Sequence, residues 1–384
     1  MRSIYFDYNA TTPLDPQVYE VMVPFLTEIY GNPSSIHHVG RRARVALDEA
    51  RERVSSLFAC KPSEVVFTSG GTESNNLAIL GSARMLRNKG RHLITSAIEH
   101  HSVLYSFQYL AENEGFRVTY LPVDGEGSVH IEALEAALCP ETTLVSIMAA
   151  NNETGVIQPV AALGALCHEH GVLFHTDAAQ WLGKEPLHSI HDFNADFVSV
   201  CSHKFHGPKG AGALFVRSPL RPDPILLGGA HENELRAGTE NTASIIGFTE
   251  ALERFVKKPV FSRALIEPLT TRLKTLASAI ENTNFYAINA PRLANTISCS
   301  IGGCDSISLL AALDLEGICA SSGSACSAGS LKPSHVLLAM GVPFPLANSF
   351  IRFSLGRHSS LAEVDFVVSV MPRIIRRIRN TNPL

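Results

Sequence analysis

The sequence predicts an α/β protein built on a mostly parallel β-sheet, and three observations support this. Between about residues 65 and 216, short β-branched runs alternate with longer segments compatible with helices, which is typical of βαβ units. Polar and glycine-rich motifs follow several of these runs, at the positions where open α/β sheets bind ligands. Finally, 45% of the 384 residues are hydrophobic and 18% are charged, as in a packed globular protein.

Seven strands are expected in this part of the chain. Between them, residues 102–113 and 160–170 carry apolar side chains at helical spacing. The expected strands are residues 65–68, 92–95, 118–121, 144–148, 172–175, 197–200 and 213–216.

After Pro219 the alternation weakens, and a Lys257-Lys258-Pro259 break indicates a boundary near residue 257. We therefore expect a large domain over 16–256, a smaller α+β domain over 257–384, and a segment 1–15 associated with the small domain. The smaller domain is expected to hold helices at 263–280, 307–313 and 361–379 and strands at 296–301 and 350–354.

Charge and cysteine usage narrow the class of partner and the compartment. The net charge is −4, which argues against nucleic acid or an anionic membrane as the main partner. The N-terminus has no apolar signal and no stretch of about 18 apolar residues occurs, so we expect a cytoplasmic protein with a small substrate. Eight cysteines without a CxxC pair indicate reduced thiols. Six are expected in the core: Cys60, Cys139, Cys167, Cys299, Cys304 and Cys319.

The segment Thr68-Ser69-Gly70-Gly71-Thr72-Glu73 lies where a strand gives way to a helix expected to begin near Glu73. Glycines let the backbone approach an anion, and the free N–H groups of the helix start, with the Thr72 hydroxyl, would hold a phosphate. A plain turn with a threonine cap is the alternative.

Two later motifs add an acid and an amine. HTDAAQ puts Asp177 at the end of a strand, and SHKFHGPKG puts Lys204 after the next strand. Taken singly, Asp177 could be a helix cap and Lys204 a surface lysine. Pyridoxal phosphate (PLP) needs a lysine for its Schiff base, a carboxylate for its pyridine nitrogen and a loop for its phosphate. The three features in this order therefore favour a PLP site.

The sequence resembles the cysteine desulfurases, NifS/IscS-like PLP enzymes with the class V aminotransferase fold, and the likeness runs nearly end to end. It implies the PLP-dependent transferase fold type I, a homodimer, and conversion of L-cysteine to L-alanine with transfer of sulfur to an acceptor for iron-sulfur cluster assembly. The shared motifs are YFDYNATTP (5–13), GNPSS (31–35), TSGGTE, EHH (99–101), NNETG (151–155), HTDAAQ, HKFHGPKG, RAGTEN, SSGSAC and IRFSLGR.

The resemblance also implies residue roles at the cofactor. Lys204 would carry PLP and Asp177 would bind the pyridine nitrogen, while Gln180 and Asn152 would meet the ring oxygen. The phosphate would be held by Gly71, Thr72, His203 and Thr239 of the second subunit, with Cys201 where the family usually has a serine.

For the substrate, the resemblance assigns the carboxylate to Arg352, with Asn152 nearby, and proton transfer and ring stacking to His100. Only the Glu-His match selects His100 over His101. The nucleophile would be Cys326, which receives the sulfur as a persulfide. Its segment, residues 321–330, consists of small and polar residues and would span roughly 17 Å as a flexible linker, enough to reach a sulfur-acceptor protein.

Two positions depart from the family pattern. Cys201 replaces a phosphate-binding hydroxyl, unless Ser202 takes over that contact, and His231 replaces a glutamine. Another class V enzyme, a selenocysteine lyase or an aminotransferase, is the nearest alternative. A metal- or cluster-binding protein, considered because of 16 histidines and eight cysteines, lacks tight ligand spacing.

Overall fold

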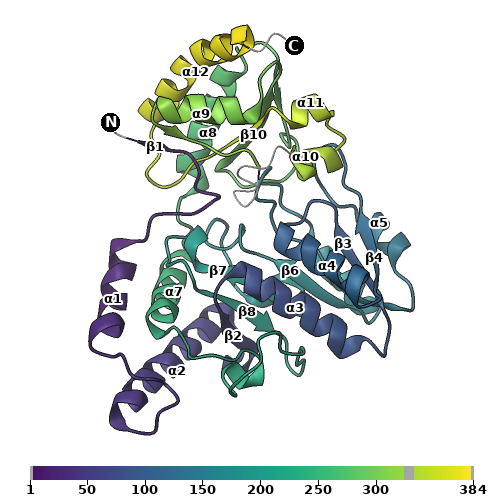
Figure 1. Cartoon of the computed structure of the whole chain (residues 1–384), viewed down its shortest axis with the longest axis vertical. Helices are drawn as coiled ribbons and strands as arrows, with labels where there is room; N and C mark the ends of the chain where they lie inside the picture. Colours follow the sequence, from purple (N-terminus) through teal and green to yellow (C-terminus); the bar gives the residue numbers. More distant parts are fainter. Residues whose placement is uncertain (1–2, 324–332, 382–384) are drawn as a thin grey trace.

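The computed structural model describes residues 3–323 and 333–381 (Figure 1). Its strands are β1 (Ile4–Tyr5), β2 (Val65–Thr68), β3 (His92–Ser96), β4 (Arg117–Leu121), β5 (Thr142–Ser146), β6 (Leu173–Asp177), β7 (Phe197–Cys201), β8 (Gly212–Val216), β9 (Thr283–Phe285), β10 (Thr296–Ile301), β11 (Ile318–Cys319) and β12 (Phe350–Ser354). Its α-helices are α1 (Pro16–Thr27), α2 (His38–Phe58), α3 (Gly71–Leu86), α4 (His101–Asn113), α5 (Ile131–Ala137), α6 (Val160–Glu169), α7 (Thr242–Phe255), α8 (Arg263–Ala277), α9 (Ser306–Leu315), α10 (His335–Ala339), α11 (Phe344–Ala347) and α12 (Leu361–Thr381).

A seven-stranded sheet forms the centre of the larger part of the molecule, in the order β2-β8-β7-β6-β5-β3-β4. Strand β8 runs antiparallel to β2 and β7, and the remaining pairs are parallel. The predicted mostly parallel sheet is thus confirmed, with strand ends shifted by up to two residues. Six of the seven strands contain almost only buried residues, as expected for a sheet covered on both faces.

Neighbouring residues of β2 identify the helices on the two faces of this sheet. Val66 packs with Leu77 and Ala78 of α3. The next residue, Phe67, makes an edge-to-face contact with Phe248 of α7, with ring centroids 6.3 Å apart. Because successive strand residues point to opposite faces, α3 and α7 cover opposite sides of the sheet.

The smaller part contains the antiparallel sheet β12-β10-β9, covered by α8, α9 and α12 (Figure 1). Helix α12 turns a stripe of apolar residues inward at a spacing of three and four: Val364, Val367, Val368, Met371, Ile374, Ile375 and Ile378. The N-terminal strand β1 pairs in parallel with β11, so the chain starts in this part and then crosses to the larger one. The domain boundaries at residues 15 and 256 fall in connecting segments and remain a prediction.

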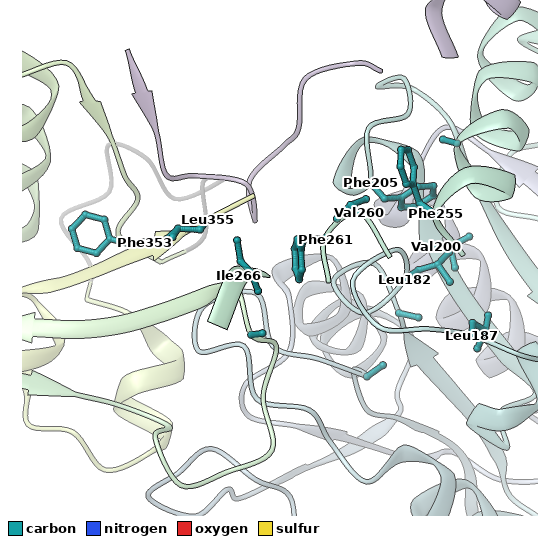
Figure 2. Packing of buried hydrophobic residues seen from close by; sticks show 14 of the residues in the cluster. Leu182, Leu187, Val200, Phe205, Phe255, Val260, Phe261, Ile266, Phe353 and Leu355 are labelled. Atoms are coloured by element: carbon teal, nitrogen blue, oxygen red, sulfur yellow. The ribbon is translucent and has the colours of Figure 1, made fainter. Parts of the chain in front are cut away.

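A continuous apolar core joins the two parts. One cluster contains Val200 and Phe205 of the larger part and Phe353 of the smaller part. Figure 2 shows Val260 and Phe261, from the connection between α7 and α8, lying between these groups. This packing fixes β12, and with it Arg352, relative to the large sheet.

Candidate active site

A cavity of about 190 Å³ lies at the carboxyl ends of β6 and β7, beneath the N-terminal segment and β12. The chain reaches it from both parts of the molecule, since Asn9 and Arg352 line it together with residues that follow the central strands. Ten of the twelve predicted site residues line this one cavity: Gly71, Thr72, His100, Asn152, Asp177, Gln180, Cys201, His203, Lys204 and Arg352.

One end of the cavity is formed by the N-terminus of α3. The helix begins at Gly71, two residues earlier than predicted, because Gly70 adopts φ 145°, ψ −174° and serves as the N-cap. No side chain caps this end, so the first N–H groups of the helix are available to an anion. His203 lines the same cavity, and burial lowers its pKa to about 4, which leaves its ring neutral near pH 7.

The carboxylate of Asp177 lies at the end of β6 and is fixed by two hydrogen bonds. The backbone N–H of Ala179 donates to Oδ1 over 2.9 Å. Asn75 Nδ2 donates to Oδ2 over 2.6 Å. These bonds set the direction of the carboxylate.

The same Asn75 connects Asp177 to His100. Its Nδ2 also lies 2.8 Å from the hydroxyl of Ser102, which is 2.7 Å from His100 Nδ1. The backbone N–H of Ser102 donates to this Nδ1, so the neutral ring carries its proton on Nε2. His101, in contrast, stacks on Tyr105 with ring centroids 5.0 Å apart and does not line the cavity.

Lys204 ends the short 3₁₀ helix Ser202–Lys204 that follows β7. Its Nζ donates to the carbonyl oxygens of Asn9 (2.6 Å) and Ala10 (2.8 Å). Burial lowers the pKa of this amine, which increases the share of the nucleophilic neutral form. Lys209, the other lysine of the motif, is exposed.

Arg352 is fully buried, with 1% of its surface exposed. Its guanidinium donates to Asp7 Oδ1 over 2.6 Å and to the carbonyl oxygen of Asn152 over 2.7 Å. Its Nε has no partner among the described residues. The cation is thus held in place by an acid and a carbonyl group at the wall of the cavity.

Two predicted site residues are not placed in the cavity. Thr239 is exposed and outside it. Cys326 falls in 324–332, outside the described residues. The flanking Ser321 exchanges two backbone hydrogen bonds with Arg352, so residues 321–323 lie beside the cavity.

The sequence missed four residues of the site, Asn9, Asn75, Ser102 and Asp7. Two of these, Asn75 and Ser102, lie outside the shared motifs and have no motif-level signal of their own. Asn9 and Asp7 do fall within YFDYNATTP, so their presence in a shared motif was the available signal.

The structure decides the alternative left open for Ser202 and corrects the prediction for three of the cysteines. Ser202 does not take over the contact expected from a serine at position 201. Its buried hydroxyl faces Gly207, where an added Cβ would lie 1.9 Å from Oγ, and Ser202 is not among the described residues lining the cavity. The prediction of six core cysteines holds for Cys167, Cys299 and Cys304. It is wrong for Cys60, Cys139 and Cys319, which are partly exposed because they stand at the ends of elements.

The described residues contain neither a candidate metal centre nor a helix that could span a membrane. Within residues 3–323 and 333–381, no group of three or more His, Cys, Asp or Glu side chains could hold a metal ion. No helix in the same part of the chain is long and apolar enough to span a membrane.

The chain is similar to a known family over nearly its whole length. The aminotransferase class-V family matches residues 4–367. Cysteine desulfurase IscS of Dictyoglomus turgidum is 45% identical over 383 residues, covering all of this chain and 97% of the relative, and that of Methanosarcina thermophila is 43% identical, covering all of this chain and 94% of the relative. Among solved structures, a NifS-like protein has a TM-score of 0.90 at 36% identity, covering 98% of this chain and all of that one. The structure of SspA in complex with cysteine has a TM-score of 0.82 at 36% identity and covers 93% of this chain and all of that one.

Proposed function

The chain belongs to the aminotransferase class-V family and is a PLP-dependent cysteine desulfurase, and we propose that it works through the cavity around Lys204. The observation that carries this proposal is that Lys204, Asp177 and the uncapped N-terminus of α3 line one cavity. The substrate of the enzyme is L-cysteine, and the sulfur of the substrate passes to an acceptor. We propose iron-sulfur cluster assembly as the use of that sulfur.

The donor set of the cavity fits PLP. The free N–H groups of α3, together with Thr72 and His203, suit a phosphate dianion. Lys204 offers an amine for covalent attachment. Asp177, held by Asn75 and Ala179, offers a carboxylate to the pyridine nitrogen. When bound, PLP supplies an electron sink that weakens the bonds at the substrate's α-carbon.

The side chains around the cavity divide the remaining work. Arg352, held by Asp7, binds the substrate carboxylate as a charge-assisted pair. The Lys204 amine, once free, accepts the α-proton at Nζ, and its lowered pKa favours the form that can do so. His100 presents a protonated Nε2, because Ser102 occupies Nδ1, and is suited to donate a proton or to stack on a ring.

Cys326 is proposed as the nucleophile. Its thiolate attacks the substrate sulfur, the carbon–sulfur bond breaks with its electrons going to carbon, and the sulfur stays on Cys326 as a persulfide. The start of its segment supports this role, since Ser321 is hydrogen-bonded to the backbone of Arg352.

The test is to incubate the holoenzyme with L-cysteine and a reductant and to measure sulfide and alanine together. We expect equal amounts of both, and Cys326→Ser should still bind PLP and cysteine while sulfide release falls by at least about a hundredfold. Cys139→Ser, at a partly exposed cysteine outside the cavity, is the matched control. Near-normal sulfide release from Cys326→Ser would instead indicate a lyase that expels sulfur directly, and formation of a keto acid would indicate an aminotransferase.

We further propose a homodimer in which Thr239 of the partner subunit completes the phosphate site. In its own chain Thr239 is exposed and does not reach the cavity. Nearby, large apolar side chains are exposed on two segments that meet through Ser34 and His231, 3.2 Å apart. These are Tyr30 (74% exposed), Ile36 (90%) and Leu227 (82%). Exposed apolar side chains gathered in this way are typical of an interface.

A cytoplasmic location is proposed as well. All seven described cysteines are free, which fits a reducing compartment. No nucleic acid or membrane is proposed as a partner.

A further inference from the structure

Lys184 is a buried lysine with no role in the proposed reaction. Only 4% of its surface is exposed, and among the described residues no carboxylate lies within ion-pair distance of its amine. Burial lowers its pKa well below the usual value for a lysine. Burying an amine without an acidic partner costs free energy, so hydrogen bonds to neutral groups must offset that cost.

The amine of Lys184 has two partners, both at the cavity. It donates to Gln180 Oε1 over 2.5 Å and to Asn9 Oδ1 over 2.7 Å. Gln180 and Asn9 line the cavity, whereas Lys184 lies behind them. An amine of lysine can donate these bonds in its charged form and in its neutral form.

These contacts fix which way the Gln180 carboxamide faces. Its oxygen takes the N–H of Lys184, and its Nε2 donates to the carbonyl oxygen of Asn9 over 2.9 Å. A carbonyl oxygen can only accept, so it requires the nitrogen on that side. One N–H of Gln180 is left over, on a side chain that lines the cavity.

We propose that Lys184 is a positioning residue, which holds the Gln180 carboxamide so that its N–H donor, and not its oxygen, serves the ring oxygen of the cofactor. The inference rests on the proposed function, in which Gln180 meets that oxygen. Without Lys184, the carboxamide would keep only the carbonyl oxygen of Asn9 to hold its orientation. Its Oε1 would lose the donor that the lysine provides and could turn toward an oxygen of the cofactor, which is repulsive.

Loss of Lys184 should affect Gln180 more than Asn9. The Asn9 side chain keeps hydrogen bonds to Asn295 (3.1 Å) and Thr296 (2.9 Å) without the lysine. For Gln180 Oε1, the lysine is the partner that the structure provides. A specific effect on the Gln180 carboxamide is therefore separable from a general loosening of the N-terminal segment.

The first test uses the protein without cofactor. The sequence has four glutamines, at 17, 108, 158 and 180, so selective ¹⁵N labelling gives four side-chain amide groups, with Gln180→Leu assigning the relevant one. We expect Lys184→Met to move the Gln180 amide signals and leave the other three in place. Lys89→Met, at an exposed lysine bonded to the carbonyl oxygen of Gly171, is the control. Unchanged Gln180 signals in folded Lys184→Met would overturn the inference.

The second test compares the affinities of PLP and of its analogue without the ring hydroxyl, read from the fluorescence of Trp181, the chain's one tryptophan, which follows Gln180. Lys184→Met should weaken PLP binding about tenfold, the effect of one hydrogen bond to a charged group, and leave analogue binding within about twofold. Gln180→Leu should do the same, and the double variant should be no worse.

The ratio of the two affinities is taken within one variant, so partial unfolding weakens both ligands alike and does not imitate the result. Equal weakening of both ligands in Lys184→Met would overturn the inference, because it indicates a structural role only. A changed ratio in Gln180→Leu with an unchanged ratio in Lys184→Met would overturn the Lys184 inference alone. An unchanged ratio in Gln180→Leu would overturn the assignment of Gln180 to the ring oxygen, and with it the inference.

Discussion

At the scale of single residues, Cys201 is the departure with the clearest chemical consequence. Its side chain lines the cavity beside Gly71, and burial raises its pKa to about 11, so it presents a neutral thiol there. A thiol is a weaker hydrogen-bond donor than a hydroxyl. If position 201 contacts the phosphate as proposed, the enzyme has a weaker donor there than a serine would provide.

We expect Cys201→Ser to slow PLP dissociation severalfold. The measurement is the loss of the enzyme's cofactor absorbance after dilution into an excess of another PLP-binding protein that lacks its cofactor. Ser202→Ala should not speed it, since that hydroxyl faces Gly207 and not the cavity. Cys139→Ser serves as a control thiol outside the cavity. Equal dissociation rates for the wild type and Cys201→Ser would mean that position 201 does not limit phosphate binding.

The residues that could be predicted are those with a chemical signature. Lys204, Asp177 and the glycine loop were identified from spacing, because each follows a strand and carries a group that PLP requires. Asn75 and Lys184 could not be predicted as parts of the site, because an asparagine in a helix and a lysine near a turn are most often solvated. Only the fold shows that one touches Asp177 and the other Gln180.

At the scale of elements, the N-terminus of α3 depends on the backbone of Gly70. Its φ of 145° with ψ near 180° is a region that essentially only glycine adopts. An added Cβ there would meet nothing within 4 Å, so strain alone opposes substitution. At Gly71, an added Cβ would lie 3.7 Å from the Cβ of Cys201, an ordinary contact.

Gly70→Ala should therefore lower the free energy of unfolding by about 1–3 kcal/mol and weaken PLP binding, as the loop relaxes away from the helix axis. Gly71→Ala should change stability by less than about 0.5 kcal/mol. Urea unfolding of both variants without cofactor checks the first part, and equal stabilities would contradict the role of φ at position 70.

The strands of the central sheet could be predicted because each is a short apolar run covered on both faces. The ends of the helices could be predicted less reliably from the sequence. Helix α8 ends at Ala277, three residues before the predicted end, although the apolar pattern continues to Ile280. Residues 278–280 form a turn after the helix, and this turn places Ile280 in the core. Tertiary packing, which sequence does not display, decides such ends.

At the scale of the whole molecule, buried histidines make stability depend on pH. Burial lowers the pKa of His175, His203 and His206 to about 4, so each is neutral in the folded chain but takes up a proton in the unfolded chain below about 6.5. Stability is therefore lost as pH falls through this window. Glu99 acts in the opposite sense, because burial raises its pKa to about 8. Its contribution to the free energy of unfolding rises as pH falls, but this single glutamate does not offset the three histidines.

We expect the free energy of unfolding to fall by about 3 kcal/mol between pH 6.5 and pH 5. His206→Asn, chosen because asparagine tolerates the φ of 66° at this position, should reduce that fall, and His188→Asn, at an exposed histidine, should not. Urea titrations of the apoprotein at the two pH values provide the measurement. A free energy that stays constant would mean that these rings are protonated in the fold.

The proposed dimer is tested by mixing two variants at a PLP concentration that saturates the wild type but not Thr239→Ala, so that each variant alone has little activity. Lys204→Ala removes the amine from one chain, and Thr239→Ala removes the hydroxyl that we assign to the neighbouring site. A mixed dimer contains one site with both groups intact, so co-refolding should restore up to about a quarter of wild-type activity. No recovery, in a mixture that light scattering identifies as dimeric, would contradict a shared site.

Asn9 links the two ends of the polypeptide. Its backbone N–H donates to the hydroxyl of Ser354 over 2.9 Å, and its carbonyl oxygen receives Lys204 and Gln180. During synthesis, Asn9 leaves the ribosome before Gln180 and Lys204, and Ser354 leaves after them. The nascent chain therefore cannot assemble a complete cavity until strand β12 has emerged, so we expect stable cofactor capture to wait for this strand.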